Sequence, residues 1–164
     1  MRGKAFKFGD NISTDHIAPG RLFHLRSNLP EFAKHVLEDA DPEFASKMSK
    51  GDFVVAGNNF GLGSSREHAP QIIKIAGVGA VIAKSFARIF YRNAINIGLL
   101  AIECDTDGID AGDELDLDIE MGILKDLTNG AIIPIEPLPP VMIKLLDDGG
   151  LVEHIKKNGD FKLI

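Results

Sequence analysis

Cysteine is almost absent from this sequence: its 164 residues include only Cys104, and tryptophan does not occur at all. A single cysteine excludes an internal disulfide framework and is typical of proteins from a reducing compartment. It also excludes an iron–sulfur cluster held by this chain alone, because such a cluster needs several thiolate ligands. Cys104 follows the apolar run Leu99–Ile102, so we expect it to be a small residue of the core or of a sheet edge.

Positive charge and long apolar runs are also scarce. The chain has 18 Lys and Arg against 24 Asp and Glu, a formal net charge of −6. It has no basic stripe interleaved with aromatic residues, so we expect no nucleic-acid partner. No apolar segment approaches the roughly 20 residues of a membrane span, and Met1–Lys4 is not followed by the apolar run of a signal peptide. The sequence therefore predicts a cytoplasmic protein with no membrane partner.

The length and composition predict one domain, residues 1–164, because a chain of this size with 45% hydrophobic residues can bury a sizeable core. Residues 52–102 alternate between strand-like and helical patterns. The expected elements are strands at 52–56, 78–83 and 99–102 and helices ending at Ala76 and Gly98. The second helix is expected to be capped by Ser85, with Ile89 on its apolar face and Arg88 and Arg92 together on another face. Such alternation predicts parallel strands joined by crossover helices.

The flanking segments have other patterns. Towards the N-terminus we expect a strand at 2–8, a loop at Gly9–Gly20 and a helix over Pro30–Ala40 with Phe32, Ala33, Val36 and Leu37 on its apolar face. Towards the C-terminus, Met121-Gly122 and Asn129-Gly130 are the turns of antiparallel hairpins. The strands and helices expected there are 113–118, 123–127, 131–135, 141–146 and 151–157. The predicted fold class is α/β, a single β/β/α domain whose central sheet has crossover helices and antiparallel hairpins towards the C-terminus.

The stretch Gly57–Pro70 is the main candidate for a site, because it reads as a strand end, a Gly-rich turn and a helix start. Ser64 and Glu67 have the S-x-x-E spacing of a capping box, which predicts a helix N-terminus at Ser64 or Ser65. An anion bound there would meet backbone N–H groups, two hydroxyls and the guanidinium of Arg66. The same environment would stabilise a serine alkoxide.

Two interpretations of this stretch stay open on spacing alone: an anion site, or a tight capped turn without chemistry. Pro70 is too deep in a helix capped by Ser64, so either the first turn is irregular or the regular helix starts near Pro70. The P-loop and dinucleotide patterns do not fit, since the first needs a Lys and the second a Gly that are absent here. Outside this stretch, Asp15 and His16 are the candidates of the first loop, where a side-chain-capped turn is the alternative. Arg21, His24 and Arg26 form either a solvated surface or an anion-facing loop.

Three motifs in this order resemble the swivelling C-terminal domain of aconitase. They are Asp10–Ile17 (Asp-Asn-Ile-Ser-Thr-Asp-His-Ile), Gly63–Ala69 (Gly-Ser-Ser-Arg-Glu-His-Ala) and Lys84–Ile89 (Lys-Ser-Phe-Ala-Arg-Ile). The resemblance covers most of residues 1–104. A stand-alone chain of this length is similar to the small subunits of the 3-isopropylmalate dehydratase and homoaconitase type, which belong to the two-chain members of the superfamily.

The resemblance implies a hydro-lyase that isomerises a hydroxy-polycarboxylic acid by dehydration and rehydration. It implies a large-subunit partner whose [4Fe–4S] cluster binds the substrate hydroxyl and one carboxylate, and no metal ligand in this chain. Ser64 matches the catalytic serine whose alkoxide removes the proton next to a carboxylate. Arg66 matches an arginine that holds a substrate carboxylate, and Ser65 flanks the same anion. Asp15 and His16 match a substrate-binding loop at the subunit junction.

Arg26 bears on the choice of substrate. In this family the loop after the Asp15-His16 motif faces the variable group: an apolar residue accompanies 3-isopropylmalate, and an arginine accompanies a third carboxylate. Arg26 therefore favours a tricarboxylate, whereas 3-isopropylmalate dehydratase of leucine biosynthesis is the commoner setting for a stand-alone chain. We expect 3-isopropylmalate, with homoaconitate or another malate derivative as the alternative. Two non-enzyme classes stay open, a carboxylate- or phosphate-binding module and a purely structural subunit.

Overall fold

The structure is a computed structural model that describes residues 1–159. Its strands are β1 (Arg2–Lys7), β2 (Phe53–Ala56), β3 (Ala80–Ala83), β4 (Ala101–Glu103), β5 (Glu114–Asp118), β6 (Ile123–Asp126) and β7 (Ile132–Pro134). Its helices are α1 (Thr14–Ile17), the 3₁₀ helix η1 (Gly20–Ser27), α2 (Leu29–Ala33), α3 (Phe44–Lys47), α4 (His68–Ala76), α5 (Arg88–Asn96), α6 (Pro140–Asp147) and α7 (Leu151–Asn158). The predicted domain runs to residue 164, and its last five residues lie outside the described part.

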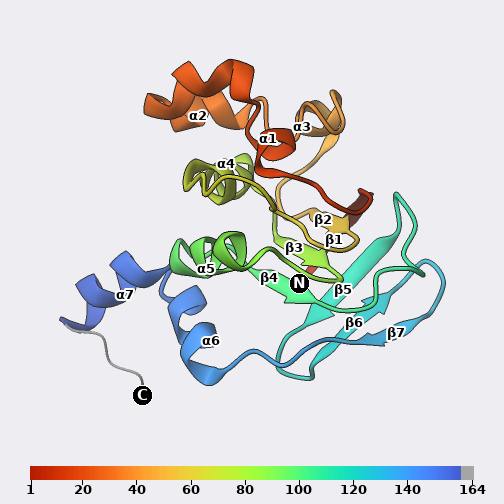
Figure 1. Cartoon of the computed structure of the whole chain (residues 1–164). Helices are drawn as coiled ribbons and strands as arrows, with labels where there is room; N and C mark the ends of the chain where they lie inside the picture. Colours follow the sequence, from red (N-terminus) through yellow and green to blue (C-terminus); the bar gives the residue numbers. More distant parts are fainter. Residues whose placement is uncertain (160–164) are drawn as a thin grey trace.

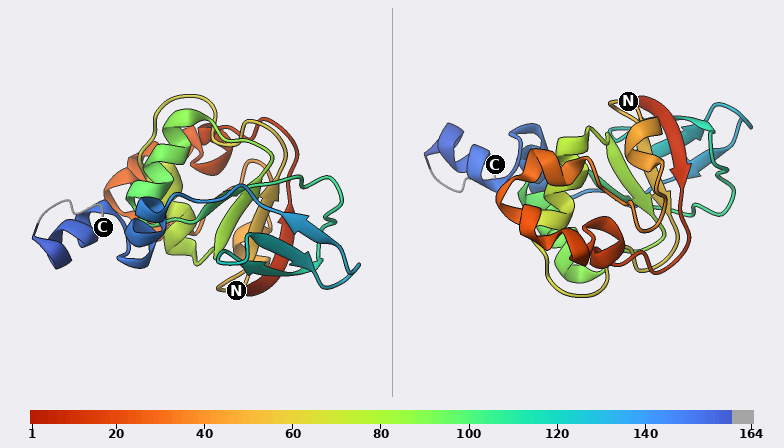
Figure 2. Two further views of the ribbon diagram at one scale, coloured as in Figure 1. Left: turned by 90° about the horizontal axis from the view of Figure 1, so that it is seen from below. Right: turned by 90° about the horizontal axis from the view of Figure 1, so that it is seen from above.

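The seven strands form one sheet in the order β4-β3-β2-β1-β5-β6-β7. β1 to β4 pair in parallel, and β5 to β7 pair antiparallel, with β1 joining the two halves. The sheet curls so that its two edge strands meet: Cys104 forms a bridge with Ile135, and the Glu136 N–H donates to the Glu103 carbonyl at 2.9 Å. The antiparallel strands thus lie on the side away from α2 and α4 (Figures 1 and 2).

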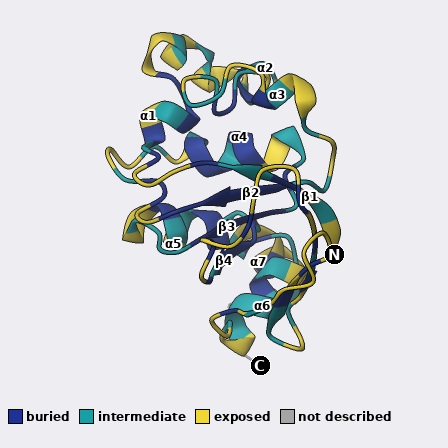
Figure 3. Cartoon of the chain, turned by 90° about the vertical axis from the view of Figure 1, so that its right-hand side faces the viewer, coloured by how far each residue is buried: buried dark blue, intermediate teal, exposed yellow. Residues whose placement is uncertain are grey.

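The parallel strands are buried on both faces, since every residue of β2 and β3 is buried (Figure 3). One face packs against α2, α4 and α5, with Val54, Val81 and Ala83 among the contacting residues. Alternate residues, such as Phe53 and Ile82, pack on the other face against β5 and β6. This continuous apolar character is typical of parallel strands covered on both sides. Within the described part, no helix has the length and apolar character needed to cross a membrane.

The predicted α/β class is confirmed, and the strands of the sheet begin and end within one or two residues of their predicted bounds. The N-terminal third differs, because α1 lies inside the segment predicted as a loop. Ser13 caps this short helix: its Oγ accepts from the His16 backbone N–H, and its own N–H donates to His16 Nδ1 at 2.9 Å. The segment that follows, which lacks a clear period, forms η1.

The helix predicted over Pro30–Ala40 is too long, since α2 ends at Ala33 and turns follow it. Leu37 has a φ of 58° and donates its backbone N–H to the Ile17 carbonyl at 2.9 Å. This tertiary bond replaces the bond that a continuing helix would make. The apolar face was predicted correctly, because Phe32, Ala33 and Leu37 are all buried.

The capping box predicted for Ser64 and Glu67 is wrong. α4 begins at His68, and its N-cap residue Glu67 makes no side-chain capping bond. The Arg66 N–H donates to the Ser64 carbonyl at 2.8 Å, so the chain turns once before the helix starts. Pro70 is then the third helical residue, where its missing N–H removes no intrahelical bond.

The start of α5 was also predicted too early. Ser85 does not cap this helix: its Oγ accepts from the Asn59 N–H at 2.8 Å, and α5 begins at Arg88 after the uncapped Ala87. Ile89, which the helical pattern placed on the apolar face, has 52% of its surface exposed. The later start of the helix places Arg88 and Ile89 beside the loop that carries Ser64.

Candidate functional site

The Gly-rich loop between β2 and α4 is held in place by the segment around α1. The Gly61 N–H donates to the Ile12 carbonyl at 2.7 Å, and the Thr14 N–H donates to the Leu62 carbonyl at 2.8 Å. Thr14 Oγ1 also donates to the Ser64 carbonyl at 3.0 Å. These bonds join two of the three motifs, so the loop reaches its conformation only when the N-terminal segment is in place.

Two glycines are required by this geometry. Gly63 has a φ of 105°, which side chains disfavour, and it places Ser64 directly after the turn. Gly61 has a φ of 85°, and a Cβ built on it would lie 2.2 Å from Phe90 Cγ. The close approach of Gly61 to Phe90 brings the loop against the first turn of α5.

A cavity of about 190 Å³ opens between the loop and α5. It is lined by Thr14, Gly61, Gly63, Ser64, Ser65, Arg66, Ala87, Arg88, Ile89, Phe90 and Asn93. The Ser64 hydroxyl makes no hydrogen bond with the described residues, so it is available to a ligand. The three predicted site residues Ser64, Ser65 and Arg66 are therefore brought together in one cavity.

Arg66 is held on the side of the loop that faces α1. Its Nη1 donates to Asp15 Oδ1 at 2.6 Å and to the Ala18 carbonyl at 2.9 Å. The Arg66 side chain is 19% exposed and that of Asp15 66% exposed. A Cβ at Gly20 would lie 3.0 Å from Asp15 Oδ1, so the chain approaches this ion pair closely. Asp15 thus contacts the predicted carboxylate-binding arginine.

The Phe23 ring connects Arg26 with this arginine. The Arg26 guanidinium carbon lies 4.4 Å from the centre of the ring, and that of Arg66 lies 6.0 Å from it. His68 packs against the same ring at 5.6 Å and stacks on Phe32 at 5.5 Å. Burial, together with the charges of Arg66 and Arg26, lowers the pKa of His68. The lowered pKa favours the neutral form of His68, whose imidazole packs against the ring over which both guanidinium groups lie.

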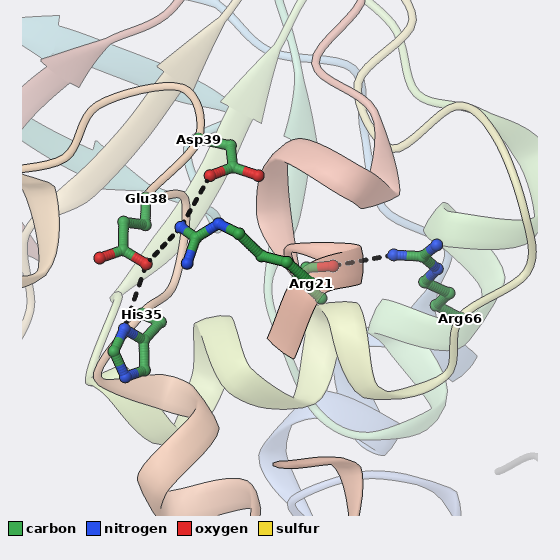
Figure 4. Close-up of polar contacts among 6 residues, drawn as sticks. Arg21, His35, Glu38, Asp39 and Arg66 are labelled. Atoms are coloured by element: carbon green, nitrogen blue, oxygen red, sulfur yellow. Dashed lines mark hydrogen bonds and ion pairs between the residues drawn. The ribbon is translucent and has the colours of Figure 1, made fainter. Parts of the chain in front are cut away.

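Other predicted candidates lie apart from the cavity. His16 caps α1 and lines a separate cavity of about 580 Å³ that also contains Asp10 and Asp39. Arg21 makes ion pairs with Glu38 at 2.8 Å and Asp39 at 2.9 Å. Figure 4 shows the Arg21 guanidinium directed at these two carboxylates, while Arg66 makes a separate contact. Among Arg21, His24 and Arg26, which the sequence groups together, Arg26 is the one whose side chain contacts the Phe23 ring.

Sequence reasoning missed the part of the site that α5 supplies. Arg88 and Asn93 line the cavity beside Ser64, and so does the rest of the first turn of α5. The pattern of α5 showed only that Arg88 and Arg92 share a face. The motif Lys84–Ile89 was the one available signal, because it contains Arg88.

The described residues do not fit an iron–sulfur cluster. Cys104 is the single cysteine and is buried at the sheet seam. Burial, and to a lesser extent Asp105, raises the pKa of its thiol to about 12, which opposes the thiolate form that a cluster ligand needs. Within residues 1–159, no group of three or more His, Cys, Asp or Glu is arranged to hold a metal ion.

Comparison with known proteins places this chain in one family. The model of the aconitase C-terminal domain matches residues 11–107. The chain is 64% identical to 3-isopropylmalate dehydratase small subunit 2 of Archaeoglobus fulgidus, over 99% of each chain. It is 53% identical to the methanogen homoaconitase small subunit of Methanothermobacter thermautotrophicus, over 98% of this chain and 93% of the other.

A solved structure agrees with these sequence matches. The crystal structure of 3-isopropylmalate dehydratase from Methanocaldococcus jannaschii superimposes with a TM-score of 0.91 at 45% identity, covering 96% of this chain and 94% of that one. The curled sheet and its helices are therefore shared along nearly the whole length. The chain belongs to the aconitase family, in the group of small subunits of 3-isopropylmalate dehydratase and homoaconitase.

Proposed function

We propose that this chain, together with a large subunit, catalyses the dehydration and rehydration of a malate derivative, with Ser64 as the base. The observation that carries the proposal is the cavity in which Ser64, Ser65 and Arg66 lie together. A hydro-lyase must remove a proton from a carbon next to a carboxylate, and that carboxylate must be held while the proton leaves. The cavity combines the unbonded Ser64 hydroxyl, which can take the proton, with the largely buried Arg66 guanidinium, which can hold the carboxylate.

Ser64 needs its surroundings to act as a base, because a serine hydroxyl is a very weak base in water. The Arg66 guanidinium and the N-terminus of α5, which adjoins the cavity, both favour negative charge on the serine oxygen. Exclusion of water strengthens both effects, since charges interact more strongly at low dielectric. We propose that docking of the large subunit covers the cavity and excludes water from it.

The remaining site residues divide by the groups they would bind. Arg66 and Ser65 hold the carboxylate next to the reacting carbon, because a guanidinium forms directional, charge-assisted bonds with a carboxylate. Arg26 faces the variable substituent of the substrate from the Phe23 ring. Asp15 positions Arg66 through their ion pair, and His16 fixes α1 at the subunit junction.

The partner and cofactor follow from this assignment. The relatives are named as small subunits, and this supports a large-subunit partner. A [4Fe–4S] cluster is proposed to lie on that partner, because this chain has one buried cysteine. A reducing, cytoplasmic setting is consistent with the same residue.

The proposed substrate is 3-isopropylmalate, which would place the enzyme in leucine biosynthesis. The names of the relatives with 64% and 62% identity support this choice. Homoaconitate is the second candidate, supported by Arg26 and by the 53% identical homoaconitase small subunit. A third carboxylate would pair with Arg26 far better than an isopropyl group does.

The test is Ser64→Ala in the pair reconstituted with its large subunit. Loss of a positioned base costs roughly 10²–10⁴-fold in rate, so turnover should fall by that factor on either substrate. Ser64 caps no helix, so the free energy of unfolding should change by no more than about 0.5 kcal/mol. Ser46→Ala, at an exposed site on α3, is the matched control. Unchanged turnover in a folded Ser64→Ala pair would contradict the proposal.

A further inference from the structure

The cavity beside Ser64 is built from two segments that carry one arginine each. Arg66 comes from the Gly-rich loop, and Arg88 is the first residue of α5. Both line the same cavity of about 190 Å³. The close approach of Gly61 to Phe90 holds the loop against α5, so the two backbone segments that carry these arginines lie on either side of one small space.

The two arginines differ in their partners. Arg66 already donates to Asp15 and to the Ala18 carbonyl through Nη1. The Arg88 side chain makes no hydrogen bond or ion pair with any residue of the described part, 1–159. Arg88 is exposed, so an anion that binds its guanidinium displaces only water and breaks no bond within the protein. The unpaired positive charge of the cavity therefore lies on Arg88.

An anion next to Arg88 would also meet favourable backbone charge. Arg88 is at the first position of α5, and the N-cap residue Ala87 offers no side-chain bond to the first turn. The first N–H groups of a helix have no intrahelical partner and carry partial positive charge. A guanidinium at this position adds up to five donors in a planar fork that matches a carboxylate.

We propose that Arg88 binds a second carboxylate of the substrate, opposite the carboxylate that Arg66 holds. The inference rests on the proposed function, because a malate derivative carries at least two carboxylates. With both carboxylates held, the two carbons between them, including the one that loses the proton, have a fixed position relative to Ser64 Oγ. Arg88 is thus a substrate-binding residue, and the ligand class that this cavity takes is a dicarboxylate.

The experiment compares Arg88→Ala and Arg88→Lys with Arg92→Ala in the reconstituted pair. Arg92 is exposed on the same helix but does not line the cavity, so it is the matched control. Loss of a charged contact should raise KM for the substrate about 10- to 100-fold in Arg88→Ala. Arg88→Lys should recover part of this loss, because it keeps the charge without the fork. Arg92→Ala should keep the KM of the unmodified pair.

A second readout separates this inference from the assignment of Ser64. Malonate and acetate are unreactive probes with two carboxylates and one, and calorimetry gives their affinity for the assembled pair. Arg88→Ala should weaken malonate about 10- to 100-fold and acetate far less. Ser64→Ala should leave malonate affinity nearly unchanged. If the Ser64→Ala pair keeps its turnover, the assignment of Ser64 as the base is wrong. The malonate affinity of the Arg88→Ala pair still tests the role of Arg88 in that case.

Two results would overturn the inference. The first is equal KM values and equal malonate affinities for Arg88→Ala and Arg92→Ala. The second is a loss of assembly with the large subunit in both Arg88→Ala and Arg88→Gln, since this would show that Arg88 contacts the partner and not the substrate. Arg88→Gln keeps the length of the side chain without its charge, so assembly of this variant supplies the measurement if Arg88→Ala fails to assemble.

Discussion

The Arg66 guanidinium donates to the Asp15 carboxylate over 2.6 Å, and this pair joins the loop of the predicted base to the N-terminal helix α1. The pair links two motifs that are about fifty residues apart in the sequence. Because Arg66 lines the cavity and Asp15 does not, the ion pair acts on the site through the position of Arg66.

Asp15→Asn tests this positioning role. The change removes the charge that fixes Arg66, and a misplacement of about 1 Å can cost roughly 10²-fold in rate, so kcat/KM should fall about 10- to 100-fold. The free energy of unfolding should fall by less than about 1 kcal/mol, because Asp15 is exposed. Asp39→Asn removes one of the two ion pairs of Arg21 outside the cavity and is the control for a lost surface pair. Equal kinetics in the two variants would remove Asp15 from the site.

Arg26→Val tests which group of the substrate this arginine meets. If Arg26 binds a third carboxylate, the variant should favour 3-isopropylmalate over homoaconitate, by up to roughly 10⁴-fold in the ratio of specificity constants. The measurement is kcat/KM for both substrates with the reconstituted pair. A ratio that does not change would mean that Arg26 points to solvent and another residue selects the substrate.

Phe23→Leu provides a graded version of the same test. The Arg26 guanidinium lies over the Phe23 ring, and cation–π contacts contribute about 0.5–1 kcal/mol at exposed sites. Removing the ring should shift the substrate ratio in the same direction as Arg26→Val, but only several-fold. Phe23→Tyr keeps an aromatic face and should keep the original ratio. A shift in the opposite direction would show that the ring itself contacts the variable group of the substrate.

Gly61→Ala should be among the most destabilising changes at the site. The new Cβ would lie 2.2 Å from Phe90 Cγ at a φ of 85°, so overpacking and backbone strain add, and the cost should exceed about 2 kcal/mol. Gly130→Ala has a similar φ of 80° with nothing within 4 Å, so it isolates the strain term, about 1–2 kcal/mol. Urea unfolding of both variants gives the difference. Equal losses would mean that α5 moves away at little cost.

Asp126 should make stability depend on pH in the hairpin region. Its side chain is 1% exposed, and Oδ2 is buried with no partner in the described part. Burial, and then the neighbouring Asp113, raise the pKa of Asp126. A raised pKa means that the folded state binds the proton more tightly, so this contribution is complete below the unfolded pKa, near 4, and is lost as pH rises through the folded pKa.

Asp126→Asn removes that titration while its oxygen still accepts from the Thr128 and Asn129 N–H groups. The variant should therefore be more stable than the unmodified chain at pH 7, with a smaller difference at pH 4. Urea unfolding at several pH values measures both. Asp118→Asn, in an exposed position on β5, controls for the loss of one negative charge. A difference that grows on acidification would reverse the assigned direction.

Much of the fold followed from local patterns in the sequence. Alternation of strands and helices between residues 52 and 102 predicted the parallel sheet, because buried strands and amphipathic helices have distinct periods. The boundaries that failed were those set by long-range contacts. Leu37 ends α2 by bonding to Ile17, and the capping spacing at Ser64 was overridden by a turn that bonds to Thr14. No local pattern contains these partners.

The site was predictable only where a motif carried it. Ser64, Ser65 and Arg66 are consecutive, so the prediction that they act together needed no tertiary information. Arg88 joins them because β3 and the start of α5 return the chain to the Gly-rich loop. The sequence could show that Arg88 and Arg92 share a helix face, but which of the two meets the loop depends on where α5 begins.

The seam between β4 and β7 has a consequence for the chain before it meets its partner. An open sheet edge offers unpaired N–H and C=O groups to other chains, and such edges promote polymerisation by strand addition. Here the two edge strands turn towards each other, and Cys104 bridges Ile135 while Glu136 bonds to Glu103. Each edge strand therefore covers part of the other, and this disfavours self-association of the small subunit before it binds the large subunit.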